Sequence, residues 1–238
     1  MKKLRLFCAG VAVVVGAQSS IAQAVRDRNM IPVAVNLNEV LRMTILNGGN
    51  IEFTFNTIAD YKSGMGNKAA AATDVAGTVV GTTASTTSMY QTDFSVASSS
   101  RWTLVYGAEQ ATFIGTDNAA NTMGLDNVGF CLTIGTSAGT VGTNWDSPLC
   151  PTFSTEVAAL EAFGATGVTM IQDATVDVGV GNGGDISDNS FHLFWQCGTA
   201  SGALGSSTAM NATAILNQSP SLERDRYITN VLFELASD

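Results

Sequence analysis

Basic residues are scarce in this chain of 238 residues, which carries 11 Lys and Arg against 20 Asp and Glu and has a formal net charge of −9. None of the basic residues lies between Arg101 and Arg224. A surface with so little positive charge repels phosphate backbones and anionic membranes. The composition therefore argues against nucleic acid as a partner.

Histidine and cysteine are also rare. The single histidine is His192, and none of the four cysteines forms a C-x-x-C pair. An ordinary structural zinc site needs four Cys or His ligands at short spacings, and this chain does not supply them. No phosphate-binding loop or dinucleotide-binding fingerprint occurs either. We therefore expect no zinc or nucleotide cofactor.

Long hydrophobic runs are absent except at the start of the chain. Lys2, Lys3 and Arg5 precede an apolar run over residues 6–16, and Ala22-Gln23-Ala24 follows as a small-x-small pattern. This is the pattern of a secretory signal peptide over residues 1–24, and the run is too short to span a bilayer. Removing three basic residues and no acid lowers the net charge from −9 to −12. We expect an exported protein with no membrane span, found at the cell surface or outside the cell.

Three cysteines remain after that cleavage, which is an odd number. One disulfide and one thiol is the simplest arrangement. A Cys131–Cys150 bond would close a short Gly/Ser/Thr-rich loop, and we place it first. A Cys131–Cys197 bond, which would join two expected strands, stays open as the alternative.

Alternating apolar and polar residues dominate the mature chain. Leu41, Met43 and Ile45 alternate with polar residues, an Asn/Gly break follows at 47–50, and alternation resumes over 51–55. Period-two alternation is typical of a strand with one buried face. Since Asn and Gly tolerate the positive φ of tight turns, we predict a β-hairpin here.

Further short strands are expected along the chain, among them residues 128–134, 191–197 and 226–235, with loops between them. Helical patterning appears once, over residues 154–163, where Ser154 can cap and Gly164 can terminate. Many short strands with scarce helix predict an all-β, antiparallel β-sandwich, Ig-like or jelly-roll-like, with one short helix. We expect residues 25–238 to form this single domain behind a flexible N-terminal segment.

The segment before the first hairpin has its own alternation, because Val33, Val35 and Leu37 are separated by Ala34 and Asn36. It is predicted to be a strand. Such a strand can pair inside its own domain, alongside residues 226–235, or can be donated to a neighbouring copy as an assembly strand. Both alternatives stay open, and pairing within the domain is the simpler one.

One motif in the sequence resembles the nucleophile motif of serine hydrolases. Residues 135–139 match G-x-S-x-G with Ser137 at the centre, and Asp177 or Asp188 followed by His192 completes the order of a hydrolase triad. A nucleophile elbow requires a helix directly after the serine, and residues 140–144 have no helical pattern. His192 lies between aromatic residues on an expected strand, where histidine is usually packed and hydrogen-bonded. We predict that the protein is not an enzyme.

Two features point to ligands instead. Asp177, Asn182, Asp185 and Asp188 gather around a Gly-rich reversal, and oxygen ligands on a flexible loop suit calcium. The same residue types are also ordinary turn formers, so calcium is the one candidate cofactor rather than an established one. Of three tryptophans, Trp102 and Trp195 fit a core, whereas Trp145 lies in a loop and is the candidate for an exposed sugar-stacking ring.

The two ends of the mature chain resemble exported β-sandwich proteins of the bacterial surface, including pilin-like and fibre-forming subunits. The likeness is carried by VAVNLNEVLRMTILNGGNIEFTF, by Ala59-Asp60-Tyr61 and by the closing RYITNVLFELASD. It implies a structural or adhesive role, with copies of the same chain or other surface proteins as partners. The alternative is an extracellular carbohydrate-binding or adhesion module that uses Trp145 and the calcium loop to bind glycan.

Overall fold

The computed structural model describes residues 34–66, 90–134, 144–149, 157–174, 181–198 and 210–237. The chain divides into two units, Met1–Leu37 and Asn38–Asp238, and every named strand belongs to the second unit. No helix in the described part has the length and apolar character needed to cross a membrane.

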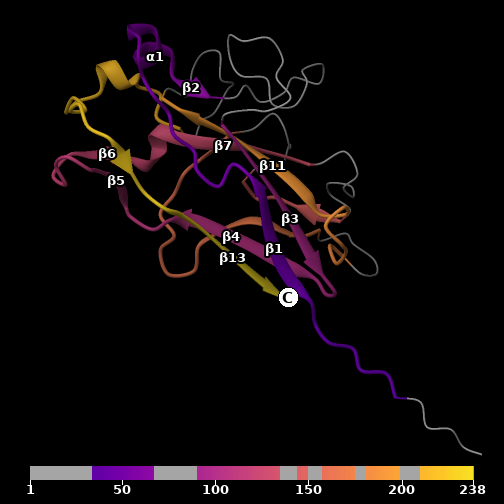
Figure 1. Ribbon diagram of the computed structural model, residues 1–238. Helices are drawn as coiled ribbons and strands as arrows, with labels where there is room; N and C mark the ends of the chain where they lie inside the picture. The colour runs from indigo at the N-terminus through magenta and orange to yellow at the C-terminus, as the bar shows by residue number, and fades with distance from the viewer. Residues whose placement is uncertain are drawn as a thin grey trace, which may run out of the picture. The chain divides into compact units, whose positions relative to one another are not determined.

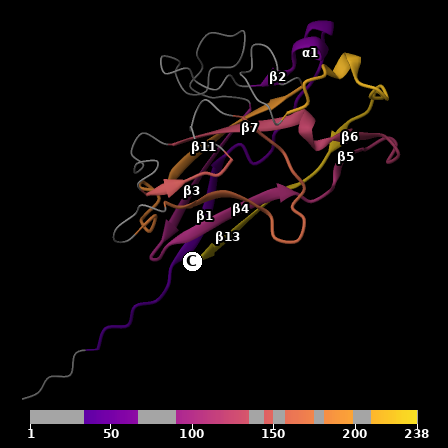
Figure 2. The same cartoon turned by 180° about the vertical axis from the view of Figure 1, so that it is seen from behind.

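Two antiparallel sheets form the body of the second unit (Figures 1 and 2). The larger sheet has the order β1-β3-β11-β7-β9, with β2 paired to β11. Its strands are β1 (Leu41–Asn47), β2 (Met65–Gly66), β3 (Gln91–Ser98), β7 (Val128–Ile134), β9 (Ala158–Ala159) and β11 (Ser190–Cys197).

The second sheet has the order β13-β4-β10-β8, and a small third sheet has the order β12-β5-β6. The four strands of the second sheet are β4 (Trp102–Ala108), β8 (Trp145–Asp146), β10 (Val168–Asp173) and β13 (Val231–Ser237). The third sheet consists of β5 (Thr112–Gly115), β6 (Thr122–Gly124) and β12 (Tyr227–Ile228). The remaining elements are α1 (Ile58–Ser63) and the short 3₁₀ turns η1 (Leu125–Asn127) and η2 (Ile215–Asn217).

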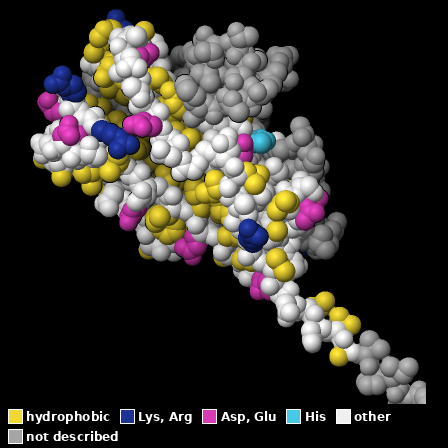
Figure 3. Space-filling view, in the orientation of Figure 1, with side chains coloured by type: hydrophobic (Ala, Val, Ile, Leu, Met, Phe, Trp, Pro, Cys, Tyr) yellow, Lys and Arg dark blue, Asp and Glu magenta, His cyan; other side chains and the backbone are white. Residues whose placement is uncertain are grey.

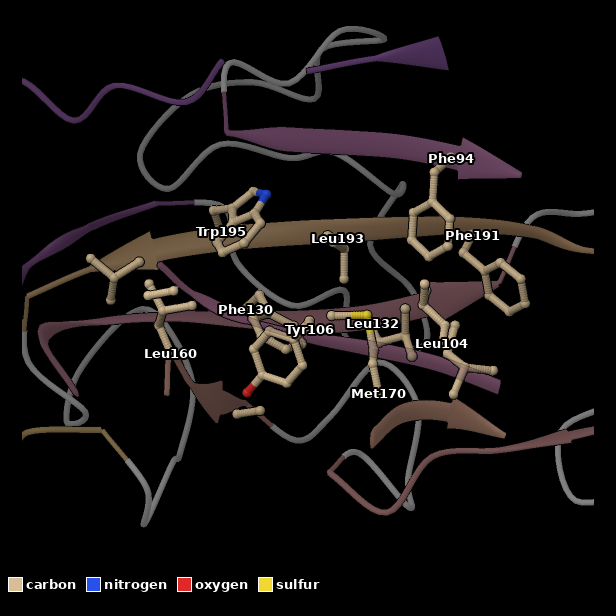
Figure 4. Close-up of a cluster of buried hydrophobic side chains, with 14 of the residues drawn as sticks. Phe94, Leu104, Tyr106, Phe130, Leu132, Leu160, Met170, Phe191, Leu193 and Trp195 are labelled. Atoms are coloured by element: carbon tan, nitrogen blue, oxygen red, sulfur yellow. The ribbon is translucent and has the colours of Figure 1, made fainter. Parts of the chain in front are cut away.

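The core lies between the two larger sheets, where alternate residues of each strand meet (Figure 4). Tyr106 of β4 packs edge-on against Phe130 of β7 with ring centroids 5.0 Å apart. Trp102 and Trp145 pack edge-on against Phe191 of β11, at 6.0 and 5.2 Å. Burial of each large aromatic side chain stabilises the fold by about 2–3 kcal/mol through transfer out of water, and the edge-on ring contacts add to this. The predicted all-β, antiparallel sandwich is therefore confirmed.

Among the described residues, the single α-helix lies in a different place from the predicted one. Residues 157–163 are not helical, because Ala158 and Ala159 form β9 against β7 and the segment from Val157 to Leu160 is buried. Pairing with an open sheet edge outweighs local helix propensity there. Ser154 lies outside the described residues. The actual helix, α1, begins at a capping box in which Thr57 and Asp60 bond each other's backbone N–H groups.

The predicted hairpin is also wrong. β1 does pair in antiparallel fashion, but with β3, more than forty residues further along the chain, and residues 51–57 form no strand. Ile51, Phe53 and Phe55 still pack against the core, and Phe53 stacks on Tyr90 at 4.6 Å. The alternation therefore predicted which side chains face inward, although it did not predict the strand partner.

Candidate functional site

The most unusual surface of the sandwich is the side where β1 and β13 lie. These strands end the two larger sheets, they contact each other, and no described strand pairs with the outer edge of either. We call this side the β1–β13 seam. Apolar side chains from both strands reach the core through it while remaining partly exposed: Leu41, Met43, Val231, Phe233 and Leu235.

More strongly exposed apolar side chains lie beside the seam as well. Ile45 is 49% exposed, Leu46 is 62% exposed and Leu232 is 41% exposed. The space-filling view shows hydrophobic side chains gathered over β1 and β13 (Figure 3). An open, apolar strand edge is a template for pairing with another chain, and monomeric proteins normally cover or charge such edges. The seam therefore has the properties of an assembly surface.

The segment before β1 does not form the predicted strand. Val33 lies outside the described residues, and residues 34–40 have no regular secondary structure and are exposed throughout. Val35 is 75% exposed and Leu37 is 92% exposed. Within the second unit, β13 pairs with β4 among the described strands. The pairing partner of residues 33–37, inside the domain or on a neighbouring copy, stays a prediction.

Three of the four residues expected to bind calcium, Asn182, Asp185 and Asp188, lie in the described part of the chain. Asp177 lies outside the described residues. Asn182 is buried, and its side-chain amide accepts from the Trp102 N–H at 2.9 Å and donates to the Trp102 carbonyl at 2.7 Å. The Asn182 carbonyl also accepts from the Trp102 indole N–H at 2.7 Å. Asn182 therefore makes with the backbone of Trp102 the two hydrogen bonds that a neighbouring strand would otherwise make.

Asp185 and Asp188 form an exposed turn within the same loop. Asp185 Oδ1 accepts from the Ser187 hydroxyl at 2.6 Å and from the Ser187 N–H at 2.7 Å, and these bonds lower the pKa of Asp185. Asp188 Oδ2 accepts from the Asp185 N–H at 3.1 Å. Among the described residues no three His, Cys, Asp or Glu side chains are grouped as a metal site requires. The described part of the loop is thus explained by turn formation.

Trp145 is not exposed, which corrects the expectation of a sugar-stacking ring. Its side chain is fully buried, and its indole N–H donates to Asn189 Oδ1 at 2.6 Å. The prediction that Trp102 and Trp195 belong to the core is confirmed. The alternation of β8 is too short to be recognised from the sequence, so Trp145 resembled a loop residue.

The predicted disulfides can be compared with the structure only for Cys131 and Cys197, since Cys150 lies outside the described residues. Cys131 and Cys197 are on adjacent strands, but Cys131 is opposite Phe194 and Cys197 is opposite Val128. They belong to separate buried clusters, so a Cys131–Cys197 bond is excluded by register. Burial raises the pKa of the Cys197 thiol to about 12, which makes it a packing residue rather than a nucleophile or metal ligand.

His192 is packed and hydrogen-bonded, as expected. Its Nδ1 lies 2.6 Å from Asp93 Oδ1, and Gln91 Nε2 donates to the same oxygen at 2.5 Å. Its ring packs near Phe194. Ser137 lies outside the described residues. Within the described chain, His192 joins β11 to β3 on the outer face of the larger sheet.

Sequence patterns missed two kinds of residue. Asp225 accepts from the backbone N–H groups of Asp117 and Asn118, at 2.9 and 3.1 Å, and so fixes the loop after β5. Arg42 and Glu234 were not singled out, although each is the single charged residue of a seam strand. For Arg42 and Glu234, the available signal in the sequence was a single charged residue within a mostly apolar strand pattern.

Comparison with known protein families finds no family model that matches this chain, and comparison with curated proteins finds no matching sequence. The function is therefore inferred from the seam and from the residues around it.

Proposed function

We propose that the protein is an exported, non-enzymatic structural subunit of the bacterial cell surface or of a filament, which associates with copies of itself by strand addition. The observation that supports it best is the β1–β13 seam, because two strand edges with no partner among the described strands and a partly exposed core lie on one side of the second unit. Strand addition would pair those edges and bury that apolar surface.

The exposed segment before β1 supplies one way of assembling. Val35 and Leu37 project without a described partner, so a segment containing Val33, Val35 and Leu37 can be donated to an open edge of another copy. The uncharged alternation of this segment suits an edge that is itself mostly apolar.

Glycan binding has less support. Its candidate ring, Trp145, is buried, and Asn182 is used to hold Trp102. No other described residue suggests a sugar-binding platform, so the structural role is the proposal we retain.

Electron microscopy of native surface material tests the proposal. We expect an ordered fibre or layer that an antibody against the mature chain labels along its length. A parallel test removes residues 25–37. If this segment is donated, the variant stays folded by circular dichroism but no longer assembles. Unlabelled surface material, together with a purified chain that stays monomeric, would contradict the structural role.

A further inference from the structure

The backbone groups that face the seam can be identified on β1. The Val40 N–H donates to Ser99 Oγ and the Val40 carbonyl accepts from the Ser99 N–H, both at 2.9 Å, so Val40 faces β3. In an antiparallel pair, successive residues direct their N–H and C=O groups to opposite sides. Leu41, Met43 and Ile45 therefore direct theirs toward the open edge.

The same alternation holds on β13. The Asn230 carbonyl accepts from the Glu109 N–H at 2.9 Å, so Asn230 faces β4. Val231, Phe233 and Leu235 consequently direct their N–H and C=O groups toward the open edge. These residues also carry the seam's partly exposed apolar side chains.

The charges of the two strands are complementary. Arg42 is exposed and makes no ion pair with a described residue, and the same is true of Glu234. Each alternates with core-facing neighbours, so each lies on the outer surface of its own sheet. Within one molecule they are on opposite faces of the sandwich and cannot pair.

We propose that two copies of the chain associate seam to seam, so that β1 of each pairs in antiparallel fashion with β13 of the other. β13 ends beside the start of β1, so the two strands run in opposite directions (Figure 1). A two-fold axis parallel to the strands leaves these directions unchanged and places the sheet of β1 in one copy beside the sheet of β13 in the other. The six-stranded sheet of each copy then continues into the four-stranded sheet of the second copy.

One register satisfies both the backbone and the charges. When Arg42 lies opposite Glu234 of the second copy, every residue that faces the open edge of β1 lies opposite one that faces the open edge of β13. The matched pairs are Leu41 with Leu235, Met43 with Phe233, and Ile45 with Val231. In an antiparallel sheet such opposed residues exchange two hydrogen bonds, and their side chains share one face. The seam's apolar side chains are thereby buried against each other.

Pairing of like strands is less favourable. If β1 paired with β1 of the second copy, neither Arg42 nor Glu234 would meet an opposite charge. The reciprocal β1–β13 arrangement forms two such pairs per dimer. It rests on the proposed structural role, and it specifies which surface associates and in which register. Because the dimer uses the seam edges of both copies, assembly beyond the dimer would use other surfaces.

Sedimentation velocity of the mature chain, residues 25–238, tests the pairing. We expect a concentration-dependent dimer. Arg42→Glu replaces two attractive pairs with two repulsive ones and should raise the dissociation constant roughly ten- to hundred-fold. Glu234→Arg should do the same, and the double variant should restore the dimer. Lys62→Glu, an exposed charge reversal on α1, is the matched control and should leave it unchanged.

Any of these results would overturn the pairing: a folded chain that stays monomeric, a dimer insensitive to both reversals, or single-variant defects that the double variant does not repair. If removing residues 25–37 abolishes association while the domain stays folded, the N-terminal segment is donated instead. That outcome would exclude this pairing and still support a structural subunit. Conversely, a dimer with the expected charge dependence and no polymer in native material would uphold the pairing and reject the proposed function.

Discussion

At the scale of single residues, Asn182 connects a surface loop to Trp102, which is fully buried at the start of β4. Its side chain bonds both the N–H and the carbonyl of Trp102, and its own N–H donates to Asp173 Oδ1 at 2.9 Å. Asp173 in turn holds Arg101 at 2.7 Å. The loop thus completes the hydrogen bonding of β4 at Trp102, beyond the last residue of β4 that pairs with β10.

Asn182→Ala should lower the free energy of unfolding by about 3 kcal/mol, because two buried backbone groups of Trp102 lose their partners. Urea denaturation monitored by tryptophan fluorescence measures this. Asn56→Ala is the control, since that exposed amide makes one long bond of 3.4 Å, and it should have little effect. Equal stability of the two variants would contradict the role given to Asn182.

Asp225 gives the fold a dependence on acid pH. The backbone N–H of Asp117 is the main cause that lowers the pKa of Asp225 from an ordinary 3.8 to about 2. Because the folded-state pKa lies below the unfolded one, Asp225 stabilises the fold above about pH 4 and loses this effect as the pH falls toward 2. Asp225→Asn should therefore be less stable than the parent at neutral pH.

The stability difference between Asp225→Asn and the parent should shrink between about pH 4 and pH 2, as urea denaturation at a series of pH values would show. Asp117→Asn is a suitable control, because Asp117 contributes its backbone N–H rather than its carboxylate to this contact. A difference that stays constant over that range would mean that the carboxylate charge of Asp225 is not responsible.

Contacts of this kind were not predictable from the sequence. Asp225 and Asp117 are 108 positions apart, and Asn182 and Trp102 are 80 apart. Asp and Asn were identified as turn and ligand residues, which is their usual role. Which backbone groups they would meet depends on how the two sheets are stacked.

At the scale of elements, the end of β1 depends on Gly48. Its φ is +67°, and a Cβ there would overlap the backbone carbonyl of Gln91. The Gly48 carbonyl accepts from the Thr92 hydroxyl at 2.7 Å. The glycine predicted to close a hairpin instead lets the chain leave β1 beside β3.

Gly48→Ala should destabilise the fold by at least about 1–2 kcal/mol from the left-handed backbone alone, with a further cost from the overlap. Gly49→Ala is a matched control next to it, since nothing lies within 4 Å of a Cβ at that position. Thermal unfolding of both variants measures the effect. Similar melting temperatures would show that the end of β1 tolerates a side chain.

Strands were predicted better than their connections. The sequence patterns located β7 over the expected residues and β11 within one residue of its expected start. The expected strand over 226–235 is divided into β12 and β13, which belong to different sheets. Alternation reports burial of one face, and it contains no information about which strand lies alongside.

At the scale of the whole molecule, Leu41 and Met43 of the apolar face predicted for residues 41–45 pack against the core between the sheets, whereas Ile45 is exposed. What could not be predicted is that β1 and β13 would end their sheets on the same side. That placement produces the seam and brings two apolar strands of opposite charge into one surface. The assembly proposal depends on it.

Residue-resolved amide hydrogen exchange on the mature chain, compared between dilute and concentrated samples, tests the seam most directly. Alternate amides should respond: those of Leu41, Met43, Ile45, Val231, Phe233 and Leu235 should exchange quickly in the dilute chain and become protected on association. The Arg42 and Glu234 amides face β3 and β4, so they should be protected in both samples. Association that leaves the six seam amides exchanging quickly would contradict the account.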